Sequence, residues 1–552
     1  MNGIKEAILC PGSRSAPLTL SFARNKGVNT RVIPDERSAA YIALGIAQRT
    51  KMPVALVCTS GTAVLNFAPA VAEAFYQQIP LVVLTADRPP EWVGQGDGQV
   101  INQQDIFGRN VKKSYTLPVD KTHKDSMWAL QRTVNEGIAM SAISPMGPVH
   151  FNIPVREPLY PKYGENPKFD TEINIIKHFK SDASISKTVW NEVIGLLIQH
   201  PKKLIVVGHL LPDMDLKTVF NSFSDANSIP VLTDLNSNLQ EAKHAISHFD
   251  QFLGNSTEID QSLIPDLLIS FGNDFLSKRL KNFVRTYRPK VHIQLLNNEI
   301  IVDTFMSITH TIKMPPSLFF NELQNRVKLN SDKAYMAQWK QLNEIVEKKL
   351  PEFVAKAGFG ELSAVRSILM ALTENTILHT SNSLPVRIAS IITSKSTQNY
   401  CNRGTSGIDG CTSTSVGAAM VSKELVVLIT GDVAFFYDRN ALWHTYLPDN
   451  LRIVLLNNGG GNIFRTVEGA KDQPELEKYF VTNQTLTAKL TAREFGLDYF
   501  SVANYDELQN IIPKFLEISL RSKILEIHAD GRHTAESLSK LTAEIKELIN
   551  RA

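Results

Sequence analysis

The residues best suited to chemistry are a carboxylate and a carboxamide that follow two apolar runs in the last third of the chain. Asp432 comes just after the run 426–430, and Asn458 comes just after the run 453–456. If these runs are neighbouring parallel strands, both side chains reach the carboxyl edge of one sheet, where α/β folds bind ligands. Such oxygen ligands suit Mg²⁺, which completes its shell with phosphates and water. The structural alternative is an Asp that merely caps a helix, followed by a Gly-rich turn.

Three glycines, 459–461, come directly after Asn458. They allow backbone groups to approach a diphosphate closely. A Gly-Asp pair, a helical segment, an apolar strand and an Asn-Asn pair together are similar to the metal and diphosphate signature of thiamin diphosphate enzymes. This similarity implies Asp432, Asn458 and Gly460 as ligands of Mg²⁺ or Mn²⁺.

A carboxyl near the start of the chain fits the other requirement of that cofactor. Thiamin diphosphate acts only after its C2 proton has left, which requires a carboxyl beside the aminopyrimidine N1′. The run Val32-Ile33-Pro34-Asp35-Glu36-Arg37-Ser38 offers Glu36, because Asp35 is the better helix N-cap. A first-turn Glu is often only a partner of the helix dipole. With the diphosphate signature beside it, Glu36 is the expected catalytic acid–base residue.

The elements that must position these residues alternate along the whole chain. Unbroken runs of Val, Leu and Ile flanked by helical patterns indicate strands buried on both faces, so we expect α/β domains with doubly wound parallel sheets. Three domains are predicted, at 1–165, 185–330 and 360–552, with polar linkers at 158–187 and 330–359, the second of them helical and rich in Lys. Expected strands are 7–10, 54–58, 81–85, 204–207, 231–233, 267–271, 291–295, 425–429, 453–456 and 524–528, and expected helices include 37–49 and 62–77.

Composition and charge narrow the class of protein. A chain of 552 residues is too long for one hydrophobic core, because a domain has about 150 residues. The 58 basic and 55 acidic residues give a net charge of +3, so no bulk attraction to nucleic acid or membrane is expected. Four scattered cysteines make neither a disulfide framework nor a zinc knuckle. Without a signal-peptide pattern or a bilayer-length apolar run, we expect a cytoplasmic protein.

Several further motifs resemble one family of thiamin diphosphate enzymes, the 2-succinyl-5-enolpyruvyl-6-hydroxy-3-cyclohexene-1-carboxylate synthases of menaquinone biosynthesis. The resemblance spans essentially the whole chain. It is carried by Pro11-Gly12-Ser13-Arg14-Ser15, Asp35-Glu36-Arg37, Thr59-Ser60-Gly61-Thr62-Ala63, Thr85-Ala86-Asp87-Arg88-Pro89-Pro90-Glu91, Asn382-Ser383-Leu384, Asn402-Arg403-Gly404-Thr405-Ser406-Gly407-Ile408-Asp409-Gly410 and the segment 431–464. It implies a homodimer or a dimer of dimers with shared active sites.

The resemblance also implies a reaction, in which 2-oxoglutarate loses CO₂ and the remaining unit adds to the ring alkene of isochorismate in a 1,4-addition. The two substrates bring four carboxylates, which call for fixed cations, preferably Arg. The implied substrate-binding residues are Ser13, Arg14, Arg88, Gln99, Lys278, Arg279, Arg387 and Arg403. The implied cofactor-binding residues are Glu36, Ser383, Ile408, Gly431, Asp432, Asn458, Gly460, Gly461, Ile463 and Phe464, with Ile408 bending the cofactor and the last two walling off water.

Two other functions stay open at this point. Another thiamin diphosphate 2-oxoacid ligase or decarboxylase, acetolactate-synthase-like, would need fewer cations, and the motifs at Arg88 and Arg403 count against it. A non-catalytic sensor would lack the activating carboxyl, whereas Glu36 is present. For each basic residue the structural alternative is a solvated surface charge. The chain departs from the family pattern in two ways: it begins almost directly on its first strand, and Ala434 stands where many relatives carry Ser.

Overall fold

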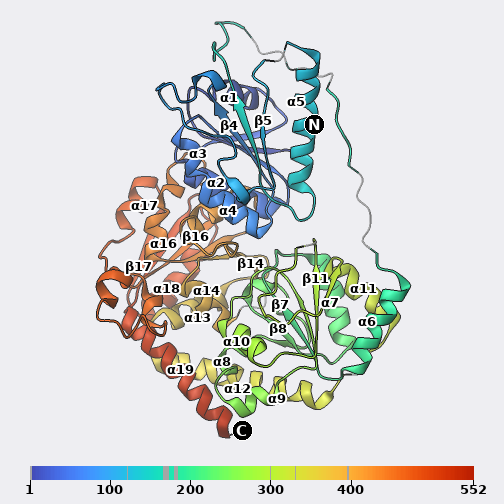
Figure 1. The fold of residues 1–552 in the computed structure, drawn as a ribbon. Helices are drawn as coiled ribbons and strands as arrows, with labels where there is room; N and C mark the ends of the chain where they lie inside the picture. The colour runs from blue at the N-terminus through green and yellow to red at the C-terminus, as the bar shows by residue number, and fades with distance from the viewer. Residues whose placement is uncertain are drawn as a thin grey trace.

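The computed structural model describes residues 3–120, 122–165, 169, 173–178, 184–298, 300–329, 331–393 and 397–551. Within these residues the chain forms three six-stranded sheets whose strand pairs are all parallel. Each sheet is flanked by helices, and the first lies above the other two in Figure 1. The predicted architecture of three α/β domains with parallel sheets is therefore confirmed.

The first sheet has the order β2-β1-β3-β4-β6-β5. Its strands are β1 (Glu6–Leu9), β2 (Asn29–Val32), β3 (Val54–Cys58), β4 (Leu81–Asp87), β5 (Lys113–Thr116) and β6 (Val149–Pro154). Its helices are α1 (Ala16–Ala23), α2 (Glu36–Thr50), α3 (Thr62–Asn66), α4 (Ala68–Gln77), α5 (Lys124–Ala142) and the short η1 (Pro90–Trp92) and η2 (Gly108–Asn110). The single helix predicted over 62–77 is wrong, because the helix is interrupted at Phe67, two residues before Pro69, which has no backbone N–H to continue it.

The second sheet has the order β12-β11-β10-β7-β8-β9. Its strands are β7 (Lys203–Val207), β8 (Val231–Thr233), β9 (Ala245–Ile246), β10 (Leu267–Phe271), β11 (Val291–Leu296) and β12 (His310–Lys313). Its helices are α6 (Lys187–Gln199), α7 (Met214–Ala226), α8 (Phe249–Phe252), α9 (Thr257–Ser262), α10 (Lys278–Thr286), α11 (Pro316–Arg326) and the short η3 (Leu235–Ser237).

The third sheet has the order β14-β13-β15-β16-β18-β17. Its strands are β13 (Ile377–Thr380), β14 (Gln398–Cys401), β15 (Val426–Gly431), β16 (Leu451–Asn457), β17 (Asp498–Val502) and β18 (Lys523–His528). Its helices are α13 (Glu361–Ala371), α14 (Leu384–Ile392), α15 (Cys411–Met420), α16 (Asp432–Tyr437), α17 (Lys489–Phe495), α18 (Tyr505–Leu516), α19 (Gly531–Arg551) and the short η4 (Arg439–Leu442), η5 (Asn462–Arg465) and η6 (Leu476–Val481).

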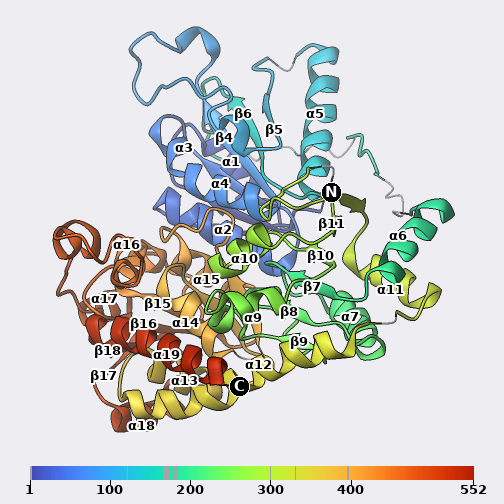
Figure 2. The ribbon, with the colours of Figure 1, turned by 60° about the horizontal axis from the view of Figure 1, so that its bottom comes forward.

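The segment predicted as a helical linker is a helix, but it packs into the core. Helix α12 (Lys333–Ala357) lies beside α19 at the bottom of Figure 2 and buries Trp339 and Val346 completely. Its apolar residues recur at helical spacing between the lysines, which is the pattern of a one-sided packed helix rather than of a linker. The chain ends 1–2 and 552, residue 330, and 166–168, 170–172 and 179–183 of the first predicted linker lie outside the described residues.

Helices α2 and α15 join the first domain to the third through direct backbone contact. A Cβ on Gly45 would lie 2.0 Å from the carbonyl oxygen of Thr414, and a Cβ on Gly417 would lie 2.1 Å from that of Ile42. Only glycine permits this approach at either position. This packing holds α2 against the third domain, and Glu36 is the first residue of that helix. Among the described helices, none is long and apolar enough to cross a membrane.

Candidate active site

The predicted site residues share one kind of position in the fold. Gly431 is the last residue of β15, and each of the others lies beyond the carboxyl end of a parallel strand, where α/β sheets bind ligands. Ser13 and Arg14 follow β1, Glu36 follows β2, Arg88 and Gln99 follow β4, Lys278 and Arg279 follow β10, Ser383 and Arg387 follow β13, Arg403 and Ile408 follow β14, Asp432 follows β15, and Asn458, Gly460, Gly461, Ile463 and Phe464 follow β16.

Glu36 borders a cavity of about 470 Å³ in the first domain, lined by residues between Pro11 and Ile101. The predicted cap is confirmed, because Oδ1 of Asp35 accepts a hydrogen bond from the backbone N–H of Ser38 at 3.1 Å. Within the described part of the chain, no hydrogen bond engages the half-buried carboxylate of Glu36. It is therefore free to exchange a proton with a ligand in the cavity.

Two predicted cations of the first domain are held by their own chain. Arg14, 4% exposed, donates from Nη1 to the carbonyl oxygen of Val155 at 3.0 Å. Arg88 donates from Nη2 to the carbonyl oxygen of Gly98 at 2.9 Å, beside Gln99, which lines the cavity at Glu36. Gln99 has a φ of 56°, a left-handed conformation that costs energy in a residue other than glycine. Ser13 is exposed at the same edge of the sheet.

A second cavity, of about 690 Å³, lies between the middle and third domains. Lys278 and Arg279 line it from the first turn of α10, and Arg387 and Ile463 line it from the third domain. Cations are unfavourable at a helix N-terminus, so the two residues on α10 are not placed there to stabilise the helix. The cavity therefore gathers three of the predicted substrate-binding cations.

One nitrogen of the Arg387 guanidinium, the buried Nη1, lacks a hydrogen-bond partner in the described part of the chain. Burial lowers the pKa of Arg387, and the nearby charge of Arg403 lowers it further. A buried donor without a partner is costly, so an anionic ligand in the second cavity would relieve this arrangement.

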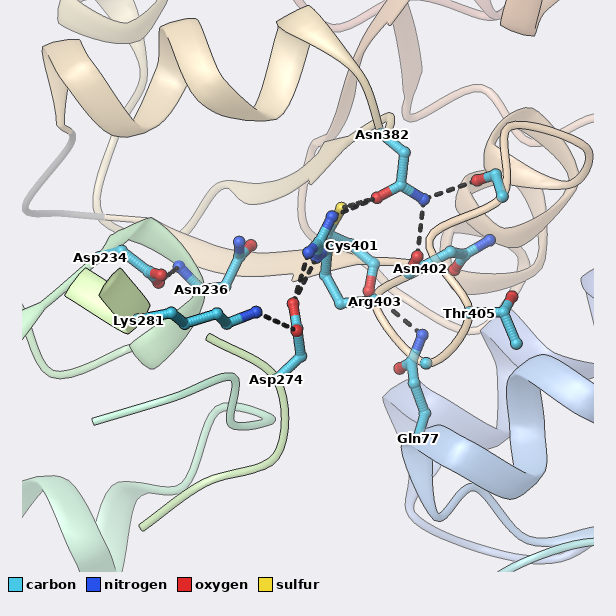
Figure 3. A network of polar contacts seen from close by, with 12 residues as sticks. Gln77, Asp234, Asn236, Asp274, Lys281, Asn382, Cys401, Asn402, Arg403 and Thr405 are labelled. Carbon is cyan, nitrogen blue, oxygen red and sulfur yellow. Dashed lines mark hydrogen bonds and ion pairs between the residues drawn. The ribbon is translucent and has the colours of Figure 1, made fainter. Parts of the chain in front are cut away.

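Arg403 is engaged in a polar network between domains, shown in Figure 3. Its guanidinium donates to Asp274 of the middle domain and, from Nη1, to Oδ1 of Asn382 at 3.1 Å. Lys281 lies 3.5 Å from the other oxygen of Asp274. Arg403 is not part of the lining of either cavity. The structure thus places Arg403 outside both cavities but near Arg387, which lines the second.

Asp432 and Asn458 meet at the edge of the third sheet as predicted. Strands β15 and β16 pair in parallel, with Gly431 opposite Leu456. Asp432 is 1% exposed, and its Oδ2 accepts from Nε2 of Gln484 at 2.6 Å. Burial raises the pKa of Asp432, while the hydrogen bonds from Gln484 and from backbone amides oppose that shift.

The loop after Asn458 packs closely against the backbone of the chain at Val481. Gly460 has a φ of 152°, and a Cβ there would lie 2.5 Å from the carbonyl oxygen of Val481. The backbone N–H of Gly461 donates to the same oxygen at 2.7 Å. Ile463, in η5, reaches the second cavity, so this loop and that cavity are contiguous. Phe464 is half-buried, with its ring centroid 5.7 Å from that of Phe480.

Ser383 and Ile408 occupy the same edge of the third sheet. Ser383 precedes α14 with φ 77° and ψ −133°, a sparsely populated conformation for a residue with a side chain. Such strain is typical of functional positions. Ile408 is half-buried in the turn between β14 and α15. Both placements agree with contact to a ligand at this edge.

Sequence reasoning missed a buried carboxyl beside this loop. Glu361, 1% exposed, accepts a hydrogen bond from Nδ2 of Asn458 at 2.7 Å. Burial raises the pKa of Glu361 to about 7, and the charge of Asp432 contributes to the shift. Glu361, like Glu36, is a glutamate in the first turn of a helix, and that pattern alone is a weak signal of function. Gln484 gave no signal, because it lies in an irregular segment that only tertiary folding brings to Asp432.

These residues fit a divalent metal that is shared with a diphosphate. In the described part of the chain, no group of three or more His, Cys, Asp or Glu side chains is arranged to hold a metal ion. A cation at this loop would therefore take one carboxylate, one carboxamide and backbone oxygen from the protein. That donor set matches Mg²⁺, which takes its other ligands from phosphates and water.

Comparison with known proteins agrees with this geometry. The chain matches the models of the N-terminal TPP-binding domain of thiamine pyrophosphate enzymes at residues 1–106, their middle domain at 175–380 and their C-terminal TPP-binding domain at 383–524. It is a thiamin diphosphate-dependent enzyme, of the transferase kind.

Curated relatives identify the family within this class. A 2-succinyl-5-enolpyruvyl-6-hydroxy-3-cyclohexene-1-carboxylate synthase of Cytophaga hutchinsonii is 39% identical over 99% of this chain and 97% of the relative. Synthases of the same name are 37% identical in Flavobacterium johnsoniae, over 95% and 93%, and 36% identical in Bacteroides thetaiotaomicron, over 99% and 97%. The chain belongs to the family of 2-succinyl-5-enolpyruvyl-6-hydroxy-3-cyclohexene-1-carboxylate synthases.

Proposed function

We propose that this enzyme decarboxylates 2-oxoglutarate and joins the remaining unit to isochorismate by 1,4-addition, giving 2-succinyl-5-enolpyruvyl-6-hydroxy-3-cyclohexene-1-carboxylate and CO₂ in menaquinone biosynthesis. The observation that carries this proposal is the cluster of Lys278, Arg279 and Arg387 around the second cavity. Two substrates with four carboxylates need such fixed cations. An acetolactate-synthase-like ligase, which handles fewer carboxylates, does not.

The chain's own residues have separate tasks in this proposal. Thiamin diphosphate supplies, when bound, a carbon nucleophile and an electron sink for loss of CO₂. Glu36 exchanges a proton with N1′ of the aminopyrimidine, which its unengaged carboxylate supports. Asp432, Asn458 and Gly460 hold Mg²⁺ or Mn²⁺. Ser383, Ile408, Gly431 and Gly461 bind the cofactor, and Ile463 and Phe464 keep water from the reacting carbon.

The remaining predicted residues bind substrate carboxylates and hydroxyls in this account. Ser13, Arg14, Arg88 and Gln99 act from the first domain, and Lys278, Arg279, Arg387 and Arg403 act from the other two. The proposal keeps the domain limits 1–165, 185–330 and 360–552, which the three separate sheets support. Both substrates are multiply charged and cross a bilayer poorly, so we place the enzyme with them in the cytoplasm.

We further propose a homodimer, or a dimer of dimers, whose active sites are shared between protomers. The cavity at Glu36 is lined by first-domain residues alone, whereas the metal loop and the cation cavity belong to the other domains. Each cavity carries part of the predicted site. A twofold axis would set the Glu36 of one protomer against the Asp432 and Asn458 of its partner, and would repeat this contact at a second site.

The experiment that tests the function combines the protein with thiamin diphosphate, Mg²⁺, 2-oxoglutarate and isochorismate. We expect loss of isochorismate absorbance together with release of CO₂, and neither when cofactor or either substrate is omitted. Release of CO₂ with isochorismate unchanged would instead identify a simple 2-oxoacid decarboxylase. Equal use of pyruvate in place of 2-oxoglutarate would favour the acetolactate-synthase-like alternative.

A further inference from the structure

The two carboxamides of the Asn457-Asn458 pair are held from opposite sides by two buried glutamates. Nδ2 of Asn457 donates to Glu526 of β18 at 2.6 Å. Nδ2 of Asn458 donates to Glu361, the first residue of α13, at 2.7 Å. The two glutamates are 0% and 1% exposed. Each carboxamide therefore has one end fixed by a carboxylate that the metal and diphosphate site does not itself use.

The surroundings of Glu361 dictate the orientation of Asn458. One carboxylate oxygen accepts from Asn458, and the other accepts from Nδ2 of Asn462 at 3.4 Å. The NH₂ end of each neighbouring amide thus faces a carboxylate oxygen of Glu361. Oδ1 of Asn458 must then face away from Glu361, toward the loop, where it accepts from the backbone N–H of Gly460 at 3.3 Å.

The helix dipole explains a glutamate in the first turn of α13 but not its burial, because an exposed carboxylate can make the same interaction. Oγ of Ser363 accepts from the backbone N–H of Gly360 at 3.0 Å, so that donor does not call for the carboxylate of Glu361. A buried carboxylate is costly, and the negative charge of Asp432 nearby makes Glu361 more so. A cation beside Asp432 and Asn458 would offset both charges. The two neighbouring carboxylates are thus unfavourable without a cation and suited to a site that holds one.

We propose that Glu361 is a positioning residue of the metal and diphosphate loop, which fixes the carboxamide of Asn458 with its oxygen toward the cation. This inference rests on the proposed function, in which Asp432 and Asn458 hold a divalent metal. Glu361 acts through Asn458 and Asn462 and touches neither cofactor nor substrate. The expected specificity is for a hard divalent cation shared with a diphosphate.

The test measures Mg²⁺-dependent binding of thiamin diphosphate by titration calorimetry, without substrates, in wild type and Glu361→Gln. A glutamine presents one NH₂ group, which competes with the NH₂ of Asn458 and lets that carboxamide turn. We expect the apparent affinity for Mg²⁺ to fall about 10- to 100-fold, the usual effect of losing a partner that orients a metal ligand. The melting temperature of the metal-free protein should not fall, because a buried charge is removed.

A second substitution separates orientation from stability. Asp at position 458 offers an oxygen in either orientation, so Asn458→Asp in the Glu361→Gln background should restore Mg²⁺ affinity to within a few-fold of wild type. In the wild-type background, Asn458→Asp would place a carboxylate against that of Glu361, so it should weaken Mg²⁺ binding. Glu73→Gln is the matched control: Glu73 is also 1% exposed and accepts from the backbone N–H of Gly404 at 2.7 Å, remote from this loop, so Mg²⁺ affinity should stay unchanged.

Three results would overturn the inference. Wild-type Mg²⁺ affinity in Glu361→Gln, or a lower melting temperature without loss of affinity, would make Glu361 a structural residue only. Failure of the double variant to recover affinity, with its fold intact by circular dichroism, would remove the orientation of Asn458 from the explanation. If wild type binds thiamin diphosphate equally well without divalent metal, the proposed metal site fails together with this role.

Discussion

Arg403 and Asp274 form an ion pair that ties the third domain to the middle domain. Nε and Nη2 of Arg403 lie 2.9 and 2.5 Å from the same carboxylate oxygen of Asp274. A guanidinium carries more N–H donors than these contacts and the hydrogen bond to Asn382 use, so donors remain for a ligand. Arg403 therefore makes an interdomain contact and retains donors, which is compatible with the substrate role proposed for it.

The first prediction concerns this arginine. In Arg403→Ala we expect kcat/KM for one of the two substrates to fall roughly 10- to 100-fold, because a charge-assisted hydrogen bond to a carboxylate contributes about 1.5–3 kcal/mol. Steady-state kinetics with each substrate varied in turn measures this. Arg403→Lys is the matched control and should recover only part of the loss, since an ammonium cannot span Asp274 and Asn382. Unchanged kinetics for both substrates would leave Arg403 a purely structural residue.

The second prediction compares two adjacent carboxyls. Glu36→Gln should retain thiamin diphosphate binding and lose turnover by a factor on the order of 10² to 10⁴, the usual effect of removing a positioned acid–base group. Asp35→Ala should instead lower the melting temperature, because the hydrogen bond to Ser38 that caps α2 is lost, at about 1 kcal/mol. Exchange of the cofactor C2 proton, followed by NMR, measures the first effect. Near-normal exchange in Glu36→Gln would remove Glu36 from the mechanism.

The third prediction tests the shared active site. Glu36→Gln and Asp432→Ala should each abolish most activity, since one lacks the acid–base carboxyl and the other a metal ligand. In a mixed dimer, one site collects both changes and the other collects neither. With random pairing about half of the dimers are mixed, so co-expression should restore roughly a quarter of wild-type activity. Purification through two different tags isolates the mixed dimer, and absence of recovery there would mean that each site is built within one chain.

The fourth prediction concerns pH and a buried histidine. Burial lowers the pKa of His150 to about 4. Its Nε2 and Nδ1 lie 2.8 and 3.0 Å from the hydroxyls of Thr85 and Ser114. Between the unfolded value of about 6.5 and the folded value, the unfolded chain binds more protons, so this contribution to stability is lost as pH falls through that window. The difference in melting temperature between wild type and His150→Asn should shrink from pH 7 to pH 4. A constant difference would contradict the prediction.

The sequence predicted the fold where local pattern and tertiary structure agree. Strands such as β3 and β10 are continuous apolar runs, because a parallel sheet covered on both faces demands them. Prediction failed where a sequence pattern was compatible with two different structures. The lysines of α12 suggested a linker, although its apolar residues repeat at helical spacing, and the helical pattern over 62–77 concealed the break at Phe67.

The candidate site was predictable where a motif carries the chemistry. Asp432 and Asn458 were predicted from their positions after consecutive strands, which do pair, and Glu36 was predicted because Asp35 already supplies the cap. Sequence reasoning missed Glu361, Gln484 and Asp274, because only the folded chain brings them into contact with Asn458, Asp432 and Arg403. Each contacts a predicted site residue that is remote in sequence, and nothing in its own neighbourhood distinguishes it from an ordinary polar residue.

The most direct test of the proposed reaction is the mass of the product formed from isochorismate and uniformly ¹³C-labelled 2-oxoglutarate. The account predicts that one labelled carbon leaves as CO₂ and that the other four appear in a single product together with the whole isochorismate skeleton. This product should require thiamin diphosphate and a divalent metal, and should vanish in Glu36→Gln. Labelled CO₂ with no labelled carbon joined to isochorismate would contradict the account.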